Sequence, residues 1–134
     1  MEKEIRILLI EDVPEDIWFA QIQLNTIFGS NHTLEVSDYF SKAIQLLQRK
    51  SFDIIILDLS LPDSKGLNSF EQLVNSYNIP IIIYTGLDDE LIKSAAMKHG
   101  AMDYLIKGKT TNNALKESIV KSISRYPGSH GAKL

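Results

Sequence analysis

Short apolar runs alternate along the chain with longer stretches in which apolar residues recur every three or four positions. The runs cover residues 5–10, 34–36, 54–57, 81–84 and 104–106. Three of them are almost uninterrupted isoleucine and leucine, a composition typical of strands covered on both faces in a parallel sheet. The pattern therefore predicts five parallel strands, most of them buried.

The stretches between and after these strands have helical spacing. Their apolar positions span residues 17–27, 43–47, 67–77, 92–96 and 115–123. Asp88 or Asp89 can cap the fourth helix and Gly100 can end it, while Thr110 or Thr111 can cap the fifth. Strand and helix thus alternate five times. We predict an α/β fold, a (βα)5 doubly wound parallel five-stranded sheet with helices on both faces.

A chain of 134 residues has the usual size of one domain. We expect this domain to span residues 1–125. Residues 126–134, which contain Pro127 and two glycines, are expected to form a flexible C-terminal tail.

Composition and charge indicate in which compartment the protein works and which partners it does not bind. The chain has no cysteine, which suits a reducing cytoplasm, and the apolar run at 5–10 is too short for a signal peptide or a membrane span. A formal net charge of -3 argues against general affinity for phosphate backbones. We expect a cytoplasmic protein that binds neither membrane nor nucleic acid directly.

Polar residues close four of the predicted strands. Glu11 and Asp12 follow the first strand, Asp58 the third, Thr85 the fourth and Lys107 the fifth. Ligands of doubly wound sheets bind beyond the carboxyl ends of the strands. Three carboxylates, a hydroxyl and an ammonium should therefore converge on one site.

Each of these residues also has a purely structural interpretation. Asp12 can cap the first helix, with Glu15 completing a capping box, and Thr85 can simply end its strand in a turn. Lys107 can lie along the sheet edge with its ammonium in solvent. Asp58 is harder to explain in this way, because a carboxylate directly after a buried strand is costly to desolvate without a partner. The joint occurrence of all of them favours a functional site.

The predicted group of side chains suits phosphoryl transfer. Crowded carboxylates repel one another, and a hard divalent cation such as Mg²⁺ relieves that repulsion. The Asp58 carboxylate can attack phosphorus without a general base. Mg²⁺ and Lys107 can then neutralise the phosphoryl charge, and Thr85 can donate its hydroxyl to the group once it has formed.

Four segments resemble the response-regulator receiver family of two-component phosphorelay systems, over residues 5 to about 125. They are residues 8–12, 53–63 with Gly66 shortly after, 80–86 and 100–107. Each is weak alone, but their order and spacing together are specific. The resemblance implies the flavodoxin-like strand order 2-1-3-4-5.

By this resemblance Asp58 is the phosphoacceptor, and Glu11 and Asp12 organise Mg²⁺. Asp58 itself and the backbone carbonyl of Ser60 complete the metal ligands. The donor is a phosphohistidine on a sensor histidine kinase or a histidine phosphotransfer protein. Such a domain is not an enzyme, since it catalyses only its own phosphorylation and dephosphorylation.

The resemblance also implies a switch. Lys107 binds a phosphoryl oxygen, Thr85 is the switch hydroxyl, and Tyr104 is the aromatic residue that turns inward when Thr85 moves. The surface formed by the fourth helix, fifth strand and fifth helix then controls a partner, which the sequence does not name.

Two departures from the family pattern stand out. Many members have proline after the lysine, often with a cis bond, whereas this chain has Gly108. A cis bond before a residue other than proline costs about 3 kcal/mol, so we expect a trans bond. Ser60 and Leu87 occupy two positions that influence dephosphorylation in this family, and Leu87 cannot orient a water molecule by hydrogen bonding.

Three rival functions can be weighed. An aspartyl-phosphate hydrolase requires a second aspartate where Ser60 stands. A phosphate-binding loop ending in Gly108-Lys109-Thr110 requires glycine where Asp103 stands. The serious alternative is a receiver-like protein-interaction module that is not phosphorylated, but such modules usually lose one of the key residues, and this chain keeps them all.

Overall fold

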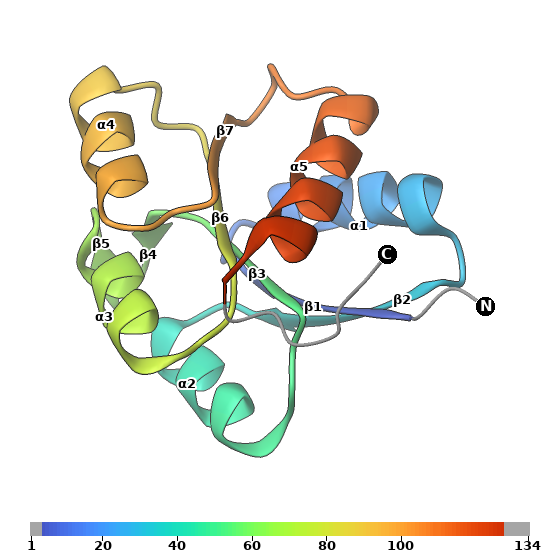
Figure 1. The fold of residues 1–134 in the computed structure, drawn as a ribbon, viewed down its shortest axis with the longest axis horizontal. Coiled ribbons are helices and arrows are strands. Elements are labelled where there is room, and N and C mark those ends of the chain that lie inside the picture. The colour runs from blue at the N-terminus through green and yellow to red at the C-terminus, as the bar shows by residue number, and fades with distance from the viewer. Residues whose placement is uncertain (1–3, 128–134) are drawn as a thin grey trace.

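Five parallel strands form the central sheet of the computed structural model, which describes residues 4–127 (Figure 1). Their spatial order is β2-β1-β3-β6-β7, and every neighbouring pair is parallel. Counted over these strands alone, the order is 2-1-3-4-5, so the predicted fold class is confirmed. The strands are β1 (Ile5–Ile10), β2 (His32–Ser37), β3 (Ile54–Leu57), β6 (Ile81–Thr85) and β7 (Asp103–Ile106).

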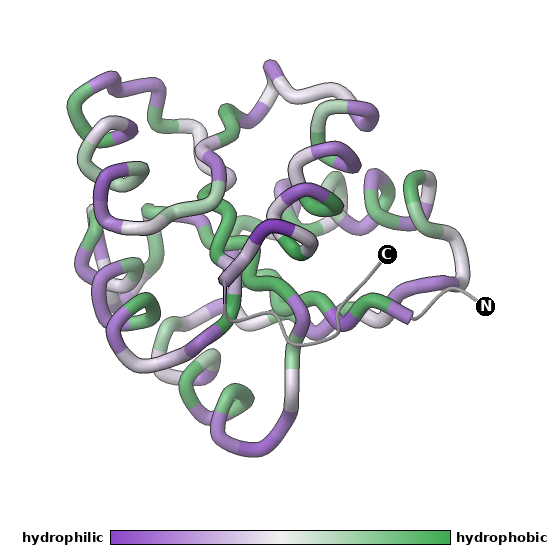
Figure 2. Tube along the Cα trace, in the orientation of Figure 1, coloured by the Kyte–Doolittle hydropathy of each residue, from purple (hydrophilic) through white to green (hydrophobic). Residues whose placement is uncertain are grey.

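Helices cover both faces of the sheet. α1 and α5 pack on one face, and α2, α3 and α4 pack on the other. Hydrophobic colouring is densest on the central strands, whereas hydrophobic and hydrophilic residues alternate around the helices (Figure 2). No helix in the described part of the chain is long and apolar enough to cross a membrane. The helices are α1 (Pro14–Phe28), α2 (Phe40–Arg49), α3 (Asn68–Ser76), α4 (Glu90–Lys98) and α5 (Asn112–Arg125).

The first residues of the helices test whether Asp12 caps α1 or belongs to the functional site. Asp89 caps α4 and Thr111 caps α5 through their side chains, as predicted. α1 instead begins at Pro14, and no side chain caps its first turn. The capping box of Asp12 and Glu15 is therefore wrong, because proline fixes the entry into this helix without a side-chain cap.

α5 ends at Arg125, where the predicted domain ends. Residues 128–134 of the predicted tail lie outside the described part of the chain. The division into domain and tail therefore stays a prediction.

A small hairpin follows β3 and was not predicted. It consists of β4 (Ser60–Leu61) and β5 (Ser64–Lys65), which pair antiparallel. Asp63, in the turn, accepts hydrogen bonds from the backbone N–H groups of Phe40 (2.8 Å) and Ser41 (3.0 Å). These are the first two residues of α2, so the hairpin supplies the cap that this helix lacks in its own sequence.

Replacing Asp63 by alanine should remove this cap. Burial acts to raise the pKa of Asp63, but the hydrogen bonds from Phe40 and Ser41 outweigh it and hold the pKa below its usual 3.8. We expect the free energy of unfolding to fall by about 1 kcal/mol at neutral pH, measured by urea denaturation. A depressed pKa stabilises the fold above pH 3.8 and loses this effect as pH falls through the folded-state value, so the difference should shrink there. Asp38→Ala, which removes an exposed ion pair with Lys42, should cost less, and an equal cost would contradict the capping role.

The outer side of α1 exposes three large apolar side chains. Trp18 is 64% exposed and Phe19 50%, and Ile22 lies one turn further along. Their opposite neighbours, Ala20 and Leu24, are buried in the core. α1 is therefore apolar on its outer side as well as on the side that packs against the sheet.

Candidate functional site

Three carboxylates meet where β1 and β3 end. Ile10 pairs with Leu57 in the sheet, so the residues that follow these strands lie side by side. Glu11 and Asp58 are only 2% and 3% exposed, and Asp12 is half-buried. One oxygen atom from each carboxylate lies within 4.8 Å of the others. We call Glu11, Asp12 and Asp58 the acidic cluster.

The acidic cluster has the donor set of a hard divalent cation. Asp12 Oδ1 is buried and has no hydrogen-bond partner among the described residues. Burial raises the pKa of Glu11 and the charge of Asp58 adds to this effect, against hydrogen bonds from Lys107 and Val13 that lower it. Crowded carboxylates with an unsatisfied oxygen fit Mg²⁺, which takes oxygen ligands. The residues present therefore fit the cation that the sequence predicts.

Lys107 bridges the cluster to α1. Its Nζ is 3.5 Å from Asp58 Oδ1 and donates hydrogen bonds to Glu11 and to Asp16 Oδ2, the latter over 2.8 Å. Burial acts to lower the pKa of Lys107, but the hydrogen bonds to Asp16 and Glu11 and the charge of Asp58 outweigh it, so the pKa is raised. The predicted meeting of Lys107 with the carboxylates is thus observed. Asp16, which is 91 residues away in the sequence, was not predicted.

The loop that carries Lys107 has a shape that suits Gly108. No cis peptide bond occurs in the described part of the chain, which confirms the expected trans bond. Gly108 has φ +82°, a conformation open to glycine and closed to proline, whose ring fixes φ near −65°. The Lys107 N–H donates to the Thr85 carbonyl over 2.8 Å, which ties the loop to β6.

A buried glutamine of α1, Gln23, contacts the end of the loop that carries Lys107, just before α5. Gln23 Oε1 accepts a 2.8 Å hydrogen bond from the Tyr84 hydroxyl. Its Nε2 donates to the Thr110 carbonyl (3.4 Å) and to Asn112 Oδ1 (3.2 Å). Gln23 therefore joins α1, β6 and the start of α5. Sequence reasoning missed it because a glutamine within an amphipathic helix gives no signal of burial.

The two switch residues share a neighbour. Thr85 is buried, and its hydroxyl oxygen accepts a hydrogen bond from the Leu87 N–H over 3.4 Å. Tyr104 is also buried, and its hydroxyl donates to the Leu87 carbonyl over 2.7 Å. Burial raises the pKa of Tyr104, as do the charges of Asp89, Asp88 and Asp58. The Tyr104 ring thus already lies inside the protein.

Ser60 begins β4, two residues beyond Asp58, and pairs with Lys65 in the hairpin. The role of its carbonyl as a metal ligand stays a prediction.

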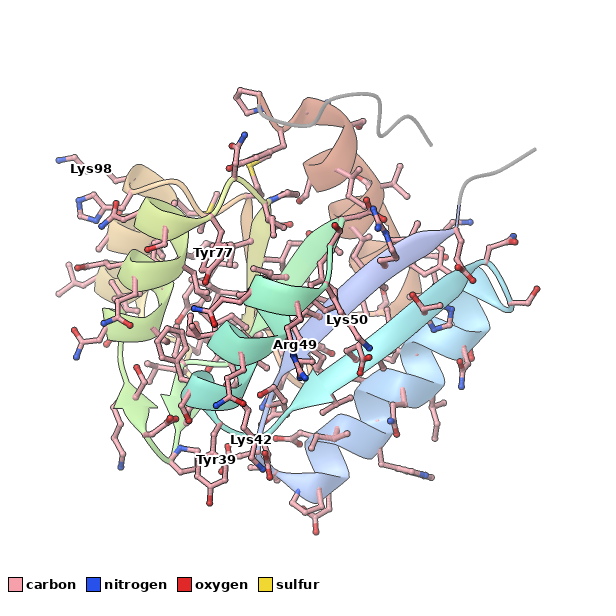
Figure 3. All side chains as sticks on the ribbon, turned by 90° about the horizontal axis from the view of Figure 1, so that it is seen from below. Tyr39, Lys42, Arg49, Lys50, Tyr77 and Lys98 are labelled. Carbon is pink, nitrogen blue, oxygen red and sulfur yellow. The ribbon has the colours of Figure 1, made fainter. Side chains whose placement is uncertain are left out.

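Two basic residues around α2, Lys42 and Lys50, form local pairs. Lys42 lies 5.1 Å from the centre of the Tyr39 ring and 3.0 Å from Asp38 (Figure 3). Lys50, at the other end of α2, pairs with Glu35 of β2.

The fold and the site define a flavodoxin-like domain with an acidic cluster and a lysine at the carboxyl ends of its strands. The chain belongs to the response regulator receiver domain family, whose model matches residues 7–119. Receiver domains of two-component systems are generally non-enzymatic modules of phosphorylation signalling.

Individual relatives agree with this assignment. The chain is 31% identical to the response regulator ArlR of Staphylococcus epidermidis, over 75% of this chain and 45% of that protein. It is 30% identical to the regulatory protein TorR of Escherichia coli, over 75% of this chain and 43% of TorR. The chain thus spans less than half the length of these relatives.

A solved structure has the same fold. The BeF3-activated receiver domain of Klebsiella pneumoniae RstA superposes with a TM-score of 0.78 at 24% identity, over 88% of this chain and 97% of that one. This likeness supports the arrangement of strands and helices.

Proposed function

We propose that this chain accepts a phosphoryl group from a phosphohistidine donor onto Asp58 and thereby controls a partner protein. The donor is a sensor histidine kinase or a histidine phosphotransfer protein. One observation carries the proposal: Asp58 is buried beside Glu11 and Asp12, and the Lys107 ammonium lies 3.5 Å from its Oδ1. A nucleophile, a cation site and a phosphate-binding ammonium therefore share one place.

The transfer forms one bond and breaks one. An Asp58 carboxylate oxygen attacks phosphorus, the P–N bond of the donor breaks, and the donor imidazole leaves with the electron pair. Lys107 stands beside Asp58 to neutralise the negative charge of the phosphoryl oxygens.

Glu11, Asp12 and Asp58 would hold Mg²⁺, with the carbonyl of Ser60 as a further ligand. Bound there, the cation supplies positive charge for the phosphoryl oxygens. Asp12 is the residue best prepared for this role, because its buried Oδ1 has no hydrogen-bond partner among the described residues.

Leu87 offers a route from the site to the surface. If the Thr85 hydroxyl turns to the phosphoryl group, it gives up its 3.4 Å hydrogen bond with the Leu87 N–H. The Leu87 carbonyl holds the Tyr104 hydroxyl, so the same residue connects Thr85 to β7. We therefore place the response on the surface formed by α4, β7 and α5.

The alternative is an interaction module that is not phosphorylated. Such a module would have no use for the acidic cluster, whose crowded carboxylates repel one another. Retention of Glu11, Asp12, Asp58 and Lys107 together favours phosphorylation.

Beryllofluoride, which mimics an acyl phosphate, tests the proposed switch. With Mg²⁺ it should perturb the amide signals of residues 85–91 and 104–111 more than those of α2, measured by heteronuclear NMR. The reason is that Thr85 and Lys107 are the groups that turn to the mimic, and both lie in these segments. Thr85→Ala should still bind the mimic but give smaller shifts beyond its own loop.

Asp58→Asn provides the matched control, since it should bind no mimic and show no such shifts. Perturbations confined to the neighbours of Asp58 at saturation would contradict the proposed surface. The domain would then bind phosphate without switching.

A further inference from the structure

Lys107 is held by a carboxylate that lies outside the acidic cluster. Asp16 is in the first turn of α1, and its Oδ2 accepts a 2.8 Å hydrogen bond from Lys107 Nζ. Glu11 accepts a second hydrogen bond from the same ammonium, whereas Asp58 Oδ1, at 3.5 Å, forms only an ion pair. Of the two hydrogen-bonded carboxylates, Asp16 is the one that does not belong to the acidic cluster.

The backbone at Lys107 is tied down while its side chain has space beside it. The Lys107 N–H donates a hydrogen bond to the Thr85 carbonyl. The loop turns at Gly108, whose φ is positive, and its peptide bonds are trans. On the α1 side, a cavity of about 270 Å³ is lined by Asp16 and Phe19 together with Lys107 itself. The ammonium can therefore exchange one acceptor for another by rotation about side-chain bonds alone.

We propose that Asp16 is a positioning residue that competes with the phosphoryl group on Asp58 for the Lys107 ammonium. The proposal rests on the function proposed above. In the unphosphorylated protein, Asp16 holds the ammonium toward α1. A phosphoryl group carries more negative charge than one carboxylate and draws the ammonium away. The Asp16 side chain is 39% exposed, so solvent screens its attraction and keeps the competition reversible.

The affinity for beryllofluoride in the presence of Mg²⁺ measures this competition. Asp16→Asn removes the charge and keeps the shape, and should lower the apparent Kd by about two- to fivefold, the range expected for a partly exposed ion pair. Asp16→Glu retains the carboxylate and should bind close to the wild type. Asp88→Asn is the control for net charge, because Asp88 is an exposed carboxylate paired with Lys109 of the same loop (3.0 Å). Its affinity should change less than that of Asp16→Asn.

The ¹⁵N signal of Lys107 Nζ gives a readout that a purely structural role would not move. In the protein without beryllofluoride, Asp16→Asn should shift this signal, because the ammonium then faces a neutral amide oxygen in place of a charged carboxylate. In the protein saturated with beryllofluoride, the wild type and Asp16→Asn should give the same signal. Asp88→Asn should leave the signal unchanged in both states.

If Asp16→Asn bound beryllofluoride no more tightly than the wild type does, the proposed competition would be wrong. The phosphoacceptor function would still stand in that case, because the wild type binds beryllofluoride. A signal difference that persists at saturation would also overturn it, since Asp16 would then still hold Lys107. A wild-type protein that binds no beryllofluoride would contradict the phosphoacceptor function and this proposal together.

Discussion

Asp58→Asn is expected to abolish phosphorylation of the chain by acetyl phosphate and Mg²⁺. The wild type should gain one phosphoryl group, detected by intact-protein mass spectrometry and lost on treatment with base or hydroxylamine. The asparagine amide carries no negative charge and is a poor nucleophile, so the variant should gain none. This is the largest effect that we expect of any single substitution.

Asp53→Asn is the matched control for this experiment. Asp53 directly precedes β3, whereas Asp58 follows it, and the Asp53 side chain pairs with Arg6 at the opposite end of the sheet. This variant should be phosphorylated like the wild type. Undiminished labelling of Asp58→Asn would mean that another residue is the acceptor and would remove the central claim.

Mg²⁺ should raise the melting temperature of the wild type. A cation that binds only the folded state at ten times its Kd stabilises it by about 1.4 kcal/mol. For a domain of this size that corresponds to roughly 4–8 °C, which differential scanning calorimetry resolves. Without a cation the three carboxylates repel one another, so the gain reflects relief of that repulsion.

Asp12→Ala should erase the response to Mg²⁺. Without the cation this variant should be at least as stable as the wild type, because it removes a buried oxygen that has no hydrogen-bond partner among the described residues. Asp38→Ala, which removes an exposed carboxylate from the segment before α2, should keep the full response. A wild-type melting temperature indifferent to millimolar Mg²⁺ would count against a cation site at the acidic cluster.

The sheet could be predicted from the sequence because its strands are nearly pure apolar runs. Residues 54–57 form β3 with the bounds expected, and the other strands differ by at most two residues at an end. Parallel strands bring their carboxyl ends to one edge, so the meeting of Glu11, Asp12, Asp58 and Lys107 followed from the fold.

The features that could not be predicted from the sequence are short strands and long-range contacts, neither of which leaves a pattern in neighbouring residues. β4 and β5 have two residues each, too few for any periodicity. Asp16 and Gln23 are polar residues of α1 whose partners lie 91 and 87 residues away, at Lys107 and Thr110. Only a three-dimensional arrangement reveals such pairs.

Tyr104 shows a different limit. A sequence can indicate that an aromatic residue takes part in a switch, but its rotamer depends on packing and on a partner such as the Leu87 carbonyl. The buried position of Tyr104 and its hydrogen bond to Leu87 were therefore beyond sequence reasoning.

The exposed side of α1 carries an optical probe of its own. Trp18 is the one tryptophan of the chain, and at 64% exposure its indole faces water. Its fluorescence should therefore be red-shifted and readily quenched by iodide in the free protein. A protein that covers the outer side of α1 should shift the emission to the blue and shield it from the quencher. Docking on this helix can thus be followed in the unlabelled, natural chain.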